Sequence, residues 1–161
     1  MEIVYYVAAS LDGYIATPQG GIEWLRPFEQ GGEDYGYGEF YASIEAVLLG
    51  RRTYEKCLEF PEWPYAGKPY WVCSHANGNT PAMVVGELKR RGLRRAWLVG
   101  GGKLAAAFRA ERLITEYIVS VVPVLLGSGI PLFDGSAAFE PLKLLGAKTY
   151  ASGIVQLRYV A

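Results

Sequence analysis

Apolar runs of strand length recur along the chain with turn residues between them, and this pattern predicts a sheet. The predicted strands are residues 3–9, 46–49, 70–73, 96–99 and 117–122. Two of these runs, 46–49 and 96–99, are apolar without alternation, as expected of strands that are covered on both faces. Pro123 cannot donate a hydrogen bond to a ladder, so it indicates a strand end or a sheet edge.

Three segments between the strands have helical character. Residues 33–44 bring aromatic and aliphatic side chains to one helical face, and residues 83–91 end in basic residues before Gly92. Residues 104–109 are helix formers that follow a run of three glycines. The stretch 20–38 is rich in glycine and aromatic residues, and we expect it to include a mobile loop.

The end of the chain predicts a hairpin, because residues 142–150 and 154–159 flank the turn Ala151-Ser152-Gly153. Helices alternate with buried strands before this hairpin. We therefore expect an α/β fold, a three-layer sandwich with a mixed, mainly parallel central sheet and a C-terminal antiparallel hairpin. The 161 residues are enough to bury one core, so we expect a single domain over residues 1–161.

Composition and charge argue against several classes of function. The 16 basic and 16 acidic residues balance, which argues against a nucleic-acid partner and requires any anion site to be built locally. Cys57, Cys73 and the single His75 do not make a zinc set, so we expect no metal and two reduced buried thiols, with a disulfide as the alternative. We expect no signal peptide and no membrane span, which needs about 20 apolar residues, and hence a cytoplasmic protein.

The strongest candidate for a binding site is Gly100-Gly101-Gly102-Lys103-Leu104, which follows a predicted strand. Glycines let the backbone approach a ligand, and the next helix would present free N–H groups to a diphosphate. The alternative is a tight turn without a ligand. Gly100, Gly102 and Ala105 also fit the dinucleotide fingerprint G-x-G-x-x-A, but they lie late in the chain and not after the first strand.

Two more strand ends carry polar residues. In Gly50-Arg51-Arg52-Thr53, the guanidinium groups can pair with phosphate oxygens. The alternative is that the arginines are solvated and Thr53 is a helix N-cap. Ser74-His75 follows another strand, and its alternative reading is a polar strand end. Because ligands of α/β sheets bind at the carboxyl ends of strands, we expect the three junctions to converge.

Four ordered motifs now resemble a known family. Residues 8–16, AASLDGYIA, resemble the opening of the reductase domain of bacterial bifunctional riboflavin-biosynthesis deaminase-reductases. Residues 49–54, LGRRTY, resemble the GR-x-T-[YW] segment of dihydrofolate reductases, and residues 98–102 and 122–133 are similar to later signatures of that superfamily. The chain is thus identified as a stand-alone member of the dihydrofolate-reductase-like superfamily, in the riboflavin reductase C-terminal domain family.

The resemblance implies NADPH binding and hydride transfer. By position, Gly50, Arg51, Arg52 and Thr53 would contact the diphosphate or the adenosine 2′-phosphate, Ser74 and His75 would flank the adenosine ribose, and Gly100–Leu104 would wrap the diphosphate. Ala8, Ala9 and Ile15 would lie near the nicotinamide. His75 stands where the family often has arginine, which weakens the expected preference for NADPH over NADH.

The residues expected to bind the substrate match the family pattern less closely than those expected to bind the cofactor. Dihydrofolate reductases place an acid on the helix after the active-site loop, and Asp34 and Glu33 are the nearest candidates here. The segment 40–43 lacks the arginine with which riboflavin-pathway reductases hold a ribose phosphate. Asp12 and Asp34 are candidate catalytic acids, with a turn role as the alternative for Asp12. Trp24 is a candidate cover for the substrate, or a core residue beneath the loop.

These observations predict an NADPH-dependent reductase that transfers hydride to a small pterin- or pyrimidine-like substrate. The alternative is a non-catalytic nucleotide-binding or regulatory module of the same fold. A homodimer through the edge near Pro123 or through the C-terminal hairpin is a further expectation.

Overall fold

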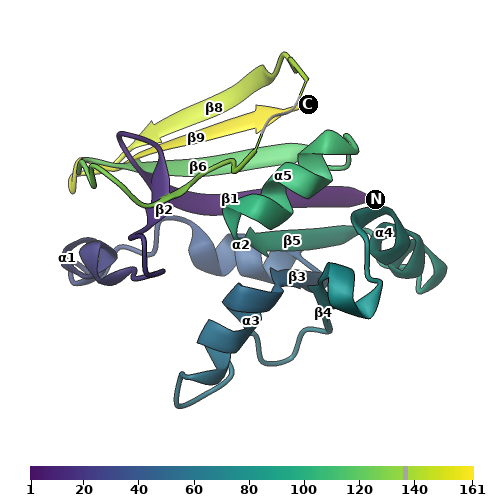
Figure 1. Cartoon of the computed structure of the whole chain (residues 1–161). Helices are drawn as coiled ribbons and strands as arrows, with labels where there is room; N and C mark the ends of the chain where they lie inside the picture. Colours follow the sequence, from purple (N-terminus) through teal and green to yellow (C-terminus); the bar gives the residue numbers. More distant parts are fainter. Residues whose placement is uncertain (136–137) are drawn as a thin grey trace.

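The computed structural model describes residues 1–135 and 138–161, and its centre is a seven-stranded sheet in the order β4-β3-β5-β1-β6-β9-β8 (Figure 1). The strands from β4 to β6 run parallel, and β9 and β8 are antiparallel, so the predicted mixed, mainly parallel sheet is confirmed. The strands of this sheet are β1 (Glu2–Ser10), β3 (Ala46–Gly50), β4 (Tyr70–Cys73), β5 (Arg95–Gly100), β6 (Glu116–Val122), β8 (Lys143–Thr149) and β9 (Val155–Val160).

Helices cover both faces of the parallel part of the sheet, which confirms the three-layer α/β sandwich (Figure 1). One face carries α2 (Tyr37–Ser43) and α3 (Arg51–Leu58), and the other carries α4 (Pro81–Arg90) and α5 (Gly102–Ala110). The short elements are β2 (Tyr14–Ala16) with its partner β7 (Ile130–Pro131), α1 (Arg26–Glu29), and the 3₁₀ turns η1 (Glu23–Leu25) and η2 (His75–Asn77). Within the described ranges, no helix is both long and apolar enough to cross a membrane.

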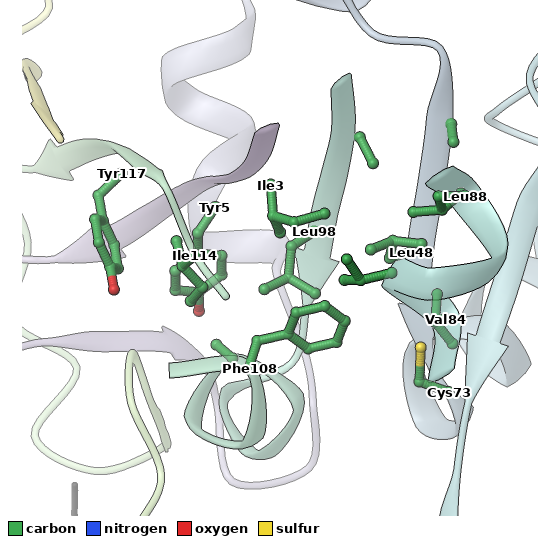
Figure 2. Close-up of a cluster of buried hydrophobic side chains, with 14 residues drawn as sticks. Ile3, Tyr5, Leu48, Cys73, Val84, Leu88, Leu98, Phe108, Ile114 and Tyr117 are labelled. Carbon is green, nitrogen blue, oxygen red and sulfur yellow. The ribbon is translucent and has the colours of Figure 1, made fainter. Parts of the chain in front are cut away.

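The side of the sheet under α4 and α5 is packed with aliphatic and aromatic side chains (Figure 2). Ile3, Leu48 and Leu98 of three neighbouring strands meet Phe108 of α5 and Leu88 of α4, and all five are at most 1% exposed. Burial of each such side chain is worth about 1.5–3 kcal/mol. The continuous apolar runs of β3 and β5 are explained by this packing, because alternate residues face helices on opposite sides.

The opposite face is built around Trp97, which several aromatic rings contact. Its indole Nε1 donates a 3.0 Å hydrogen bond to the carbonyl of Tyr6, and the rings of Phe40 and Tyr65 lie edge-on to it at 5.4 Å. The Tyr6 ring stacks on Phe40 with centroids 4.1 Å apart. Aromatic packing around Trp97 therefore covers this face of the sheet as far as Tyr6.

The helix predicted over residues 33–44 begins later, at Tyr37. Gly36 precedes it with φ of 78°, in the left-handed region, so the backbone before Tyr37 is not helical. The Asp34 carboxylate accepts hydrogen bonds from the N–H groups of Gly36 at 3.0 Å and Gly38 at 3.2 Å. Asp34 thus caps the helix, and the prediction that the helix includes residues 33–36 was wrong because a cap and a left-handed glycine compete with it.

Two other helix starts also differ from the expectation. Gly50 is the N-cap of α3 and Thr53 is the third helical residue, so the alternative reading of Thr53 as an N-cap is wrong. For α4, the Thr80 hydroxyl accepts from the N–H of Met83 and Pro81 opens the helix, two residues before the predicted start.

The C-terminal hairpin is confirmed. Strands β8 and β9 pair antiparallel, and Gly153, at φ of 91°, donates a 2.9 Å hydrogen bond to Tyr150 across the turn. Pro123 marks the end of β6, but β6 lies between β1 and β9. Pro123 is therefore at a strand end and not at an edge, and of the two places expected for a dimer contact only the hairpin offers a free strand edge.

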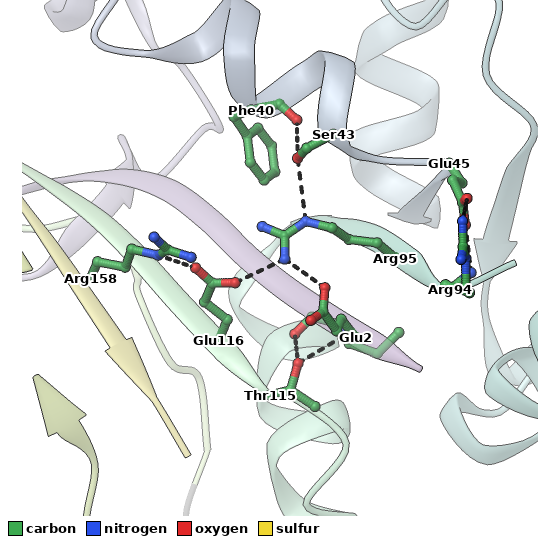
Figure 3. A network of polar contacts seen from close by, with 10 residues as sticks. Glu2, Phe40, Ser43, Glu45, Arg94, Arg95, Thr115, Glu116 and Arg158 are labelled. Carbon is green, nitrogen blue, oxygen red and sulfur yellow. Dashed lines mark hydrogen bonds and ion pairs between the residues drawn. The ribbon is translucent and has the colours of Figure 1, made fainter. Parts of the chain in front are cut away.

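An ion-pair network joins the amino ends of β1, β5 and β6 to β9 (Figure 3). Glu116 is 5% exposed and lies between Arg95, at 3.0 Å, and Arg158, while Arg95 also pairs with Glu2 at 2.7 Å. Since these are the amino ends of the parallel strands, the network holds the sheet together at the end opposite to the strand carboxyl ends.

Candidate cofactor and substrate site

The three polar junctions predicted from the sequence lie at neighbouring strand ends. Gly50, the last residue of β3, pairs with Cys73 of β4, directly before Ser74 and His75. On its other side β3 pairs with β5, where Leu49 is opposite Gly100. The carboxyl ends of these strands therefore lie side by side at one end of the sheet. This row of strand ends is called the strand-end edge below.

The turn at Gly100-Gly101 lies against Gly50. A Cβ on Gly50 would be 3.3 Å from the carbonyl oxygen of Gly100, which is a tight contact. Gly100 has φ of 128°, a conformation that side-chain-bearing residues rarely adopt, and the Gly100–Gly101 peptide bond is cis. Gly50 is thus required by close approach, and Gly100 by its backbone conformation.

Gly101 faces a small open space. A Cβ at this position would lie 3.9 Å from Cδ1 of Ile15 and 4.0 Å from Oγ1 of Thr53, so a ligand atom can fit where that side chain would stand. Gly101, Ile15 and Thr53 come from α5, β2 and α3 and their flanks. Residues that are far apart in the sequence therefore surround one space at the strand ends.

Two helices begin at this same space. The N-cap residues are Gly50 for α3 and Gly101 for α5, and neither helix has a side-chain hydrogen bond at its cap. The first turn of a helix presents N–H groups without intrahelical partners and the positive end of the dipole. Together the two starts offer several donors at short range, which suits a diphosphate.

Cationic side chains surround the helix starts. Arg51 is exposed and pairs with Glu55 at 3.1 Å along α3, while Arg52 and Lys103 are exposed. His75 is exposed at the adjacent end of β4. The Ser74 hydroxyl accepts from the N–H of Asn77 at 3.3 Å, so it caps η2 and keeps its own proton free to donate.

The edge continues from β5 to β1. Tyr5 pairs with Leu98, and Ala8 lies three residues further along β1, toward the carboxyl end of the strand. Ala8 is half-buried and lines a cavity, whereas Ala9 is 2% exposed and points to the opposite face of the sheet. Of the two alanines predicted near a nicotinamide, only Ala8 faces open space.

The cavity has a volume of about 370 Å³ and lies beside β1 and β6, under α1 and the segment before α2. Its polar and aromatic lining residues are Tyr6, Phe28, Glu29, Glu33, Asp34, Tyr35, Tyr37 and Ser120. Asp34, a predicted substrate residue, is among them. The cavity is large enough for a bicyclic heterocycle.

Tyr6 and Ser120 are the functional candidates that the sequence did not reveal. Both side chains lie on the face of the sheet that α2 covers. At this place the helices leave a gap over the strands. Burial raises the pKa of Tyr6 to about 12, so its phenol stays protonated. Gln156 donates a 3.1 Å hydrogen bond to Ser120 Oγ and another to the carbonyl of Tyr35, fixing the cavity wall. A polar residue on an otherwise apolar strand, as at Ser120, was the available signal.

Trp24 does not line the cavity, although its neighbour Leu25 does. The Trp24 indole Nε1 is buried and has no hydrogen-bond partner among the described residues. Its ring is partly covered and belongs to neither core cluster of the described residues, so both roles expected for Trp24 stay predictions.

Asp12 joins two loops. Its carboxylate accepts hydrogen bonds from Ser10 Oγ at 2.5 Å and from the N–H groups of Gly127 at 2.8 Å and Leu126 at 3.1 Å. These bonds, that from Ser10 foremost, lower the pKa of Asp12. The residue is thus held ionised as an anchor between the β1–β2 turn and the loop after β6, a role that matches the turn alternative.

Comparisons with known proteins show to which family the chain belongs. Residues 66–156 match the RibD C-terminal domain family. The Bacillus subtilis (strain 168) protein YwjB is 40% identical over 173 residues, covering 99% of this chain and 97% of YwjB. YyaP of the same organism is 28% identical over 182 residues, covering 98% of this chain and 94% of YyaP.

Solved structures share the fold. A Shewanella sp. PV-4 protein, provisionally named a riboflavin biosynthesis protein, has a TM-score of 0.88 at 26% identity, with 99% of this chain and 98% of that chain covered. The Thermotoga maritima diaminohydroxyphosphoribosylaminopyrimidine deaminase/5-amino-6-(5-phosphoribosylamino)uracil reductase has a TM-score of 0.75 at 13% identity, and 99% of this chain covers 56% of that protein.

The ordered motifs, the sandwich with its strand-end glycine turn, and these matches lead to one conclusion. The chain belongs to the RibD C-terminal domain family and has its dihydrofolate-reductase-like fold.

Proposed function

We propose that this protein is an NADPH-dependent reductase that transfers hydride to a small, planar, pterin- or pyrimidine-like heterocycle. The observation that carries the proposal is the meeting of two helix starts without side-chain caps, α3 and α5, at Gly50 and Gly101. The family match to proteins of riboflavin biosynthesis and to a named uracil reductase supports the same chemistry.

The diphosphate of the cofactor would lie across the two helix starts. The N–H groups of Gly102, Lys103 and Leu104 are the first of α5, and those of Arg51 and Arg52 are the first of α3. Gly101 leaves the space that a phosphate oxygen requires, and the Thr53 hydroxyl borders that space. Because these donors are held by the sheet, they need no rearrangement on binding.

The adenosine end would lie over β3 and β4. Arg52 makes no ion pair within the described parts of the chain, so its guanidinium is available to a 2′-phosphate. Ser74 and His75 flank the same edge, with His75 as a hydrogen-bonding partner for the ribose.

The nicotinamide end would reach Ala8 and Ile15, next to the cavity. When bound, NADPH supplies a hydride from C4 of its nicotinamide ring. Ala8 and Ile15 give this place an apolar wall, which restricts water and fixes the distance between the two rings.

The substrate would occupy the cavity beside Ala8. Tyr6 and Ser120 offer neutral hydroxyl groups within it, and Asp34 lies at its rim. Hydride transfer to a C=O or C=N bond also requires a proton. We assign that proton to water at the exposed rim, because Asp12 is ionised and engaged by backbone N–H groups.

A thermal-shift screen of the full chain with NADPH, NADH, FAD and folates tests the cofactor. Binding specific to the native state at a hundredfold excess over Kd raises the free energy of unfolding by about 2.7 kcal/mol. NADPH should give the largest shift. Stabilisation by FAD alone, or by none of these compounds, contradicts the proposal. Stabilisation by NADPH without oxidation of it in the presence of any pterin or pyrimidine favours the non-catalytic module.

A further inference from the structure

Asparagine occurs at two positions of the chain, 77 and 79, and both lie in the loop that connects β4 to α4. Asn77 is followed by Gly78, whereas Asn79 is followed by the β-branched Thr80. Residues 75–78 are exposed to solvent. The two asparagines thus share one loop and differ in the residue that follows each of them.

The residue that follows an asparagine decides how readily its side-chain amide reacts with the backbone. The nitrogen of Gly78 can attack Cγ of Asn77, and the approach is least hindered at glycine because it has no Cβ. A bond forms between this nitrogen and Cγ, the Cγ–Nδ2 bond breaks, and ammonia leaves with the proton of the Gly78 N–H. Water then opens the cyclic imide at either carbonyl, which yields aspartate or isoaspartate without any oxidant or reductant.

The fold holds the attacking nitrogen weakly. The Gly78 N–H donates to the His75 carbonyl at 3.3 Å, which is longer than most N–H···O bonds. Gly78 has φ of 72°, and a Cβ built on it would contact nothing within 4 Å. No packed side chain therefore shields this nitrogen, and a small opening of the loop frees it.

The amide that would react is held by two hydrogen bonds. Asn77 Nδ2 donates to the Val72 carbonyl at 3.1 Å, and Asn77 Oδ1 accepts from the N–H of Asn79 at 3.1 Å. The bond to Oδ1 draws electron density from Cγ and favours attack, whereas the bond to Val72 keeps the amide against β4. We therefore expect the reaction to proceed through brief opening of the loop, more slowly than in the unfolded chain.

Conversion of Asn77 would change how the loop is held. Asn79 Nδ2 donates to the same Val72 carbonyl at 3.1 Å, so two side-chain amides attach the loop to β4. A carboxylate at position 77 has no N–H to donate and would bring a negative charge to that carbonyl oxygen. The N–H of Asn77 also donates to Ser74 Oγ at 3.3 Å, so the position of Ser74 depends on the same residue.

We propose that Asn77 is a site of spontaneous deamidation and isomerisation in the folded protein, with Asn79 as an unreactive neighbour. The modification adds one negative charge to the loop that begins with Ser74 and His75, beside the strand-end edge. Its consequence, a lower affinity for NADPH as the protein ages, rests on the proposed function. The modification itself does not depend on that function.

Peptide mapping by mass spectrometry of the full chain, after incubation in mildly alkaline buffer, tests the site. Fragmentation of the peptide distinguishes position 77 from position 79. We expect Asn77 to gain the mass difference between a hydroxyl and an amino group, as two separable products, aspartate and isoaspartate. Half of Asn77 should convert before any conversion of Asn79 is detected, and the chain unfolded in urea should convert faster.

Two variants give matched comparisons. Gly78→Ala retains Asn77 and adds a methyl group beside the attacking nitrogen, so conversion at Asn77 should stay below detection while the unmodified chain converts by half. Asn79→Ser retains the reactive pair and removes one of the two bonds to Val72, so it should convert at Asn77 at least as fast as the unmodified chain. Urea unfolding of each variant reports whether the fold is retained.

Three results would overturn the inference: no conversion in the folded chain once the urea-unfolded chain has converted fully, equal conversion at Asn77 and Asn79, or undiminished conversion in a folded Gly78→Ala protein. The first two need no variant.

Calorimetry of Asn77→Asp with NADPH tests the consequence. Its affinity should fall about two- to fivefold, the usual worth of one exposed charge interaction. An unchanged affinity refutes the consequence alone. If the unmodified chain does not bind NADPH, the proposed function fails, whereas conversion at Asn77 in that chain still supports the modification site.

Discussion

Gly102 lies so close to Pro131 that a Cβ on Gly102 would be 2.3 Å from the Pro131 carbonyl oxygen. The first residue of α5 is thereby pressed against the end of β7, and Asp134 adds a 3.3 Å hydrogen bond from its N–H to the Gly102 carbonyl. Because β7 pairs with β2, this contact holds β2, which carries Ile15, beside the glycine turn.

Gly102→Ala should therefore destabilise the protein by about 1–3 kcal/mol, the usual penalty for inserting a methyl group where there is no space. Urea unfolding measures the effect. Gly86→Ala is the control, since Gly86 lies inside α4 with no heavy atom within 4 Å of an added Cβ. It should stabilise by about 0.5–1 kcal/mol, the helix-propensity difference. A stable Gly102→Ala would show that α5 and β7 are not in close contact.

Two variants of the ion-pair network at the other end of the sheet should differ in their effect on the free energy of unfolding. Glu116→Gln leaves Arg95 and Arg158 without their shared buried carboxylate and should lower the free energy of unfolding by about 2–3 kcal/mol. Glu2→Gln, which removes an exposed partner of Arg95, should change it by less than about 1 kcal/mol. Equal effects of the two variants in urea unfolding would contradict the buried role of Glu116.

Asp12 predicts a pH dependence of stability. Its pKa is lowered in the folded state, so its contribution is present above the ordinary carboxyl pKa of about 4 and is lost as the pH falls through the folded value. Asp12→Asn should flatten the decline of unfolding free energy below that pH. Glu39→Gln serves as the comparison, because no described donor bonds to that carboxylate. If the unfolding free energy of Asp12→Asn falls at low pH as steeply as that of the unmodified chain, Asp12 does not anchor the two loops.

Arg52 is predicted to read the 2′-phosphate. Arg52→Gln should weaken NADPH binding about tenfold, the loss of one charge-assisted contact, and should affect NADH binding much less. Calorimetry with both cofactors checks the difference. Arg94→Gln, at an exposed site directly before the amino end of β5, should leave both affinities unchanged. Equal losses for NADPH and NADH in Arg52→Gln would remove this residue from the 2′-phosphate site.

The sheet and its strand ends were predictable because the signal is local. Apolar runs that end in glycine, as at Gly50 and Gly100, mark buried strands and the turns that follow them. The start of α3 was missed, since its sequence RRTYEKCL has few apolar residues to reveal a helical period. The helix at 33–44 was drawn too long because Gly36 and the Asp34 cap act against its first turn.

The cavity was harder to foresee. Tyr6 and Ser120 are alternate residues of strands that look buried on both faces, and only the arrangement of α1 and α2 leaves space above them. Asp34 was named through a family resemblance, and its place at the rim depends on a turn whose geometry no short motif specifies.

The most direct test of the account is the NADPH affinity of Gly101→Val, measured by calorimetry on the full chain. Gly101 has φ of −89°, which other residues adopt, and an added Cβ would make ordinary contacts of 3.9 Å and 4.0 Å. The variant should fold while its side chain fills the space between Ile15 and Thr53, and its NADPH affinity should fall by about tenfold or more. A folded Gly101→Val protein that binds NADPH as tightly as the unmodified chain would contradict the proposed cofactor site.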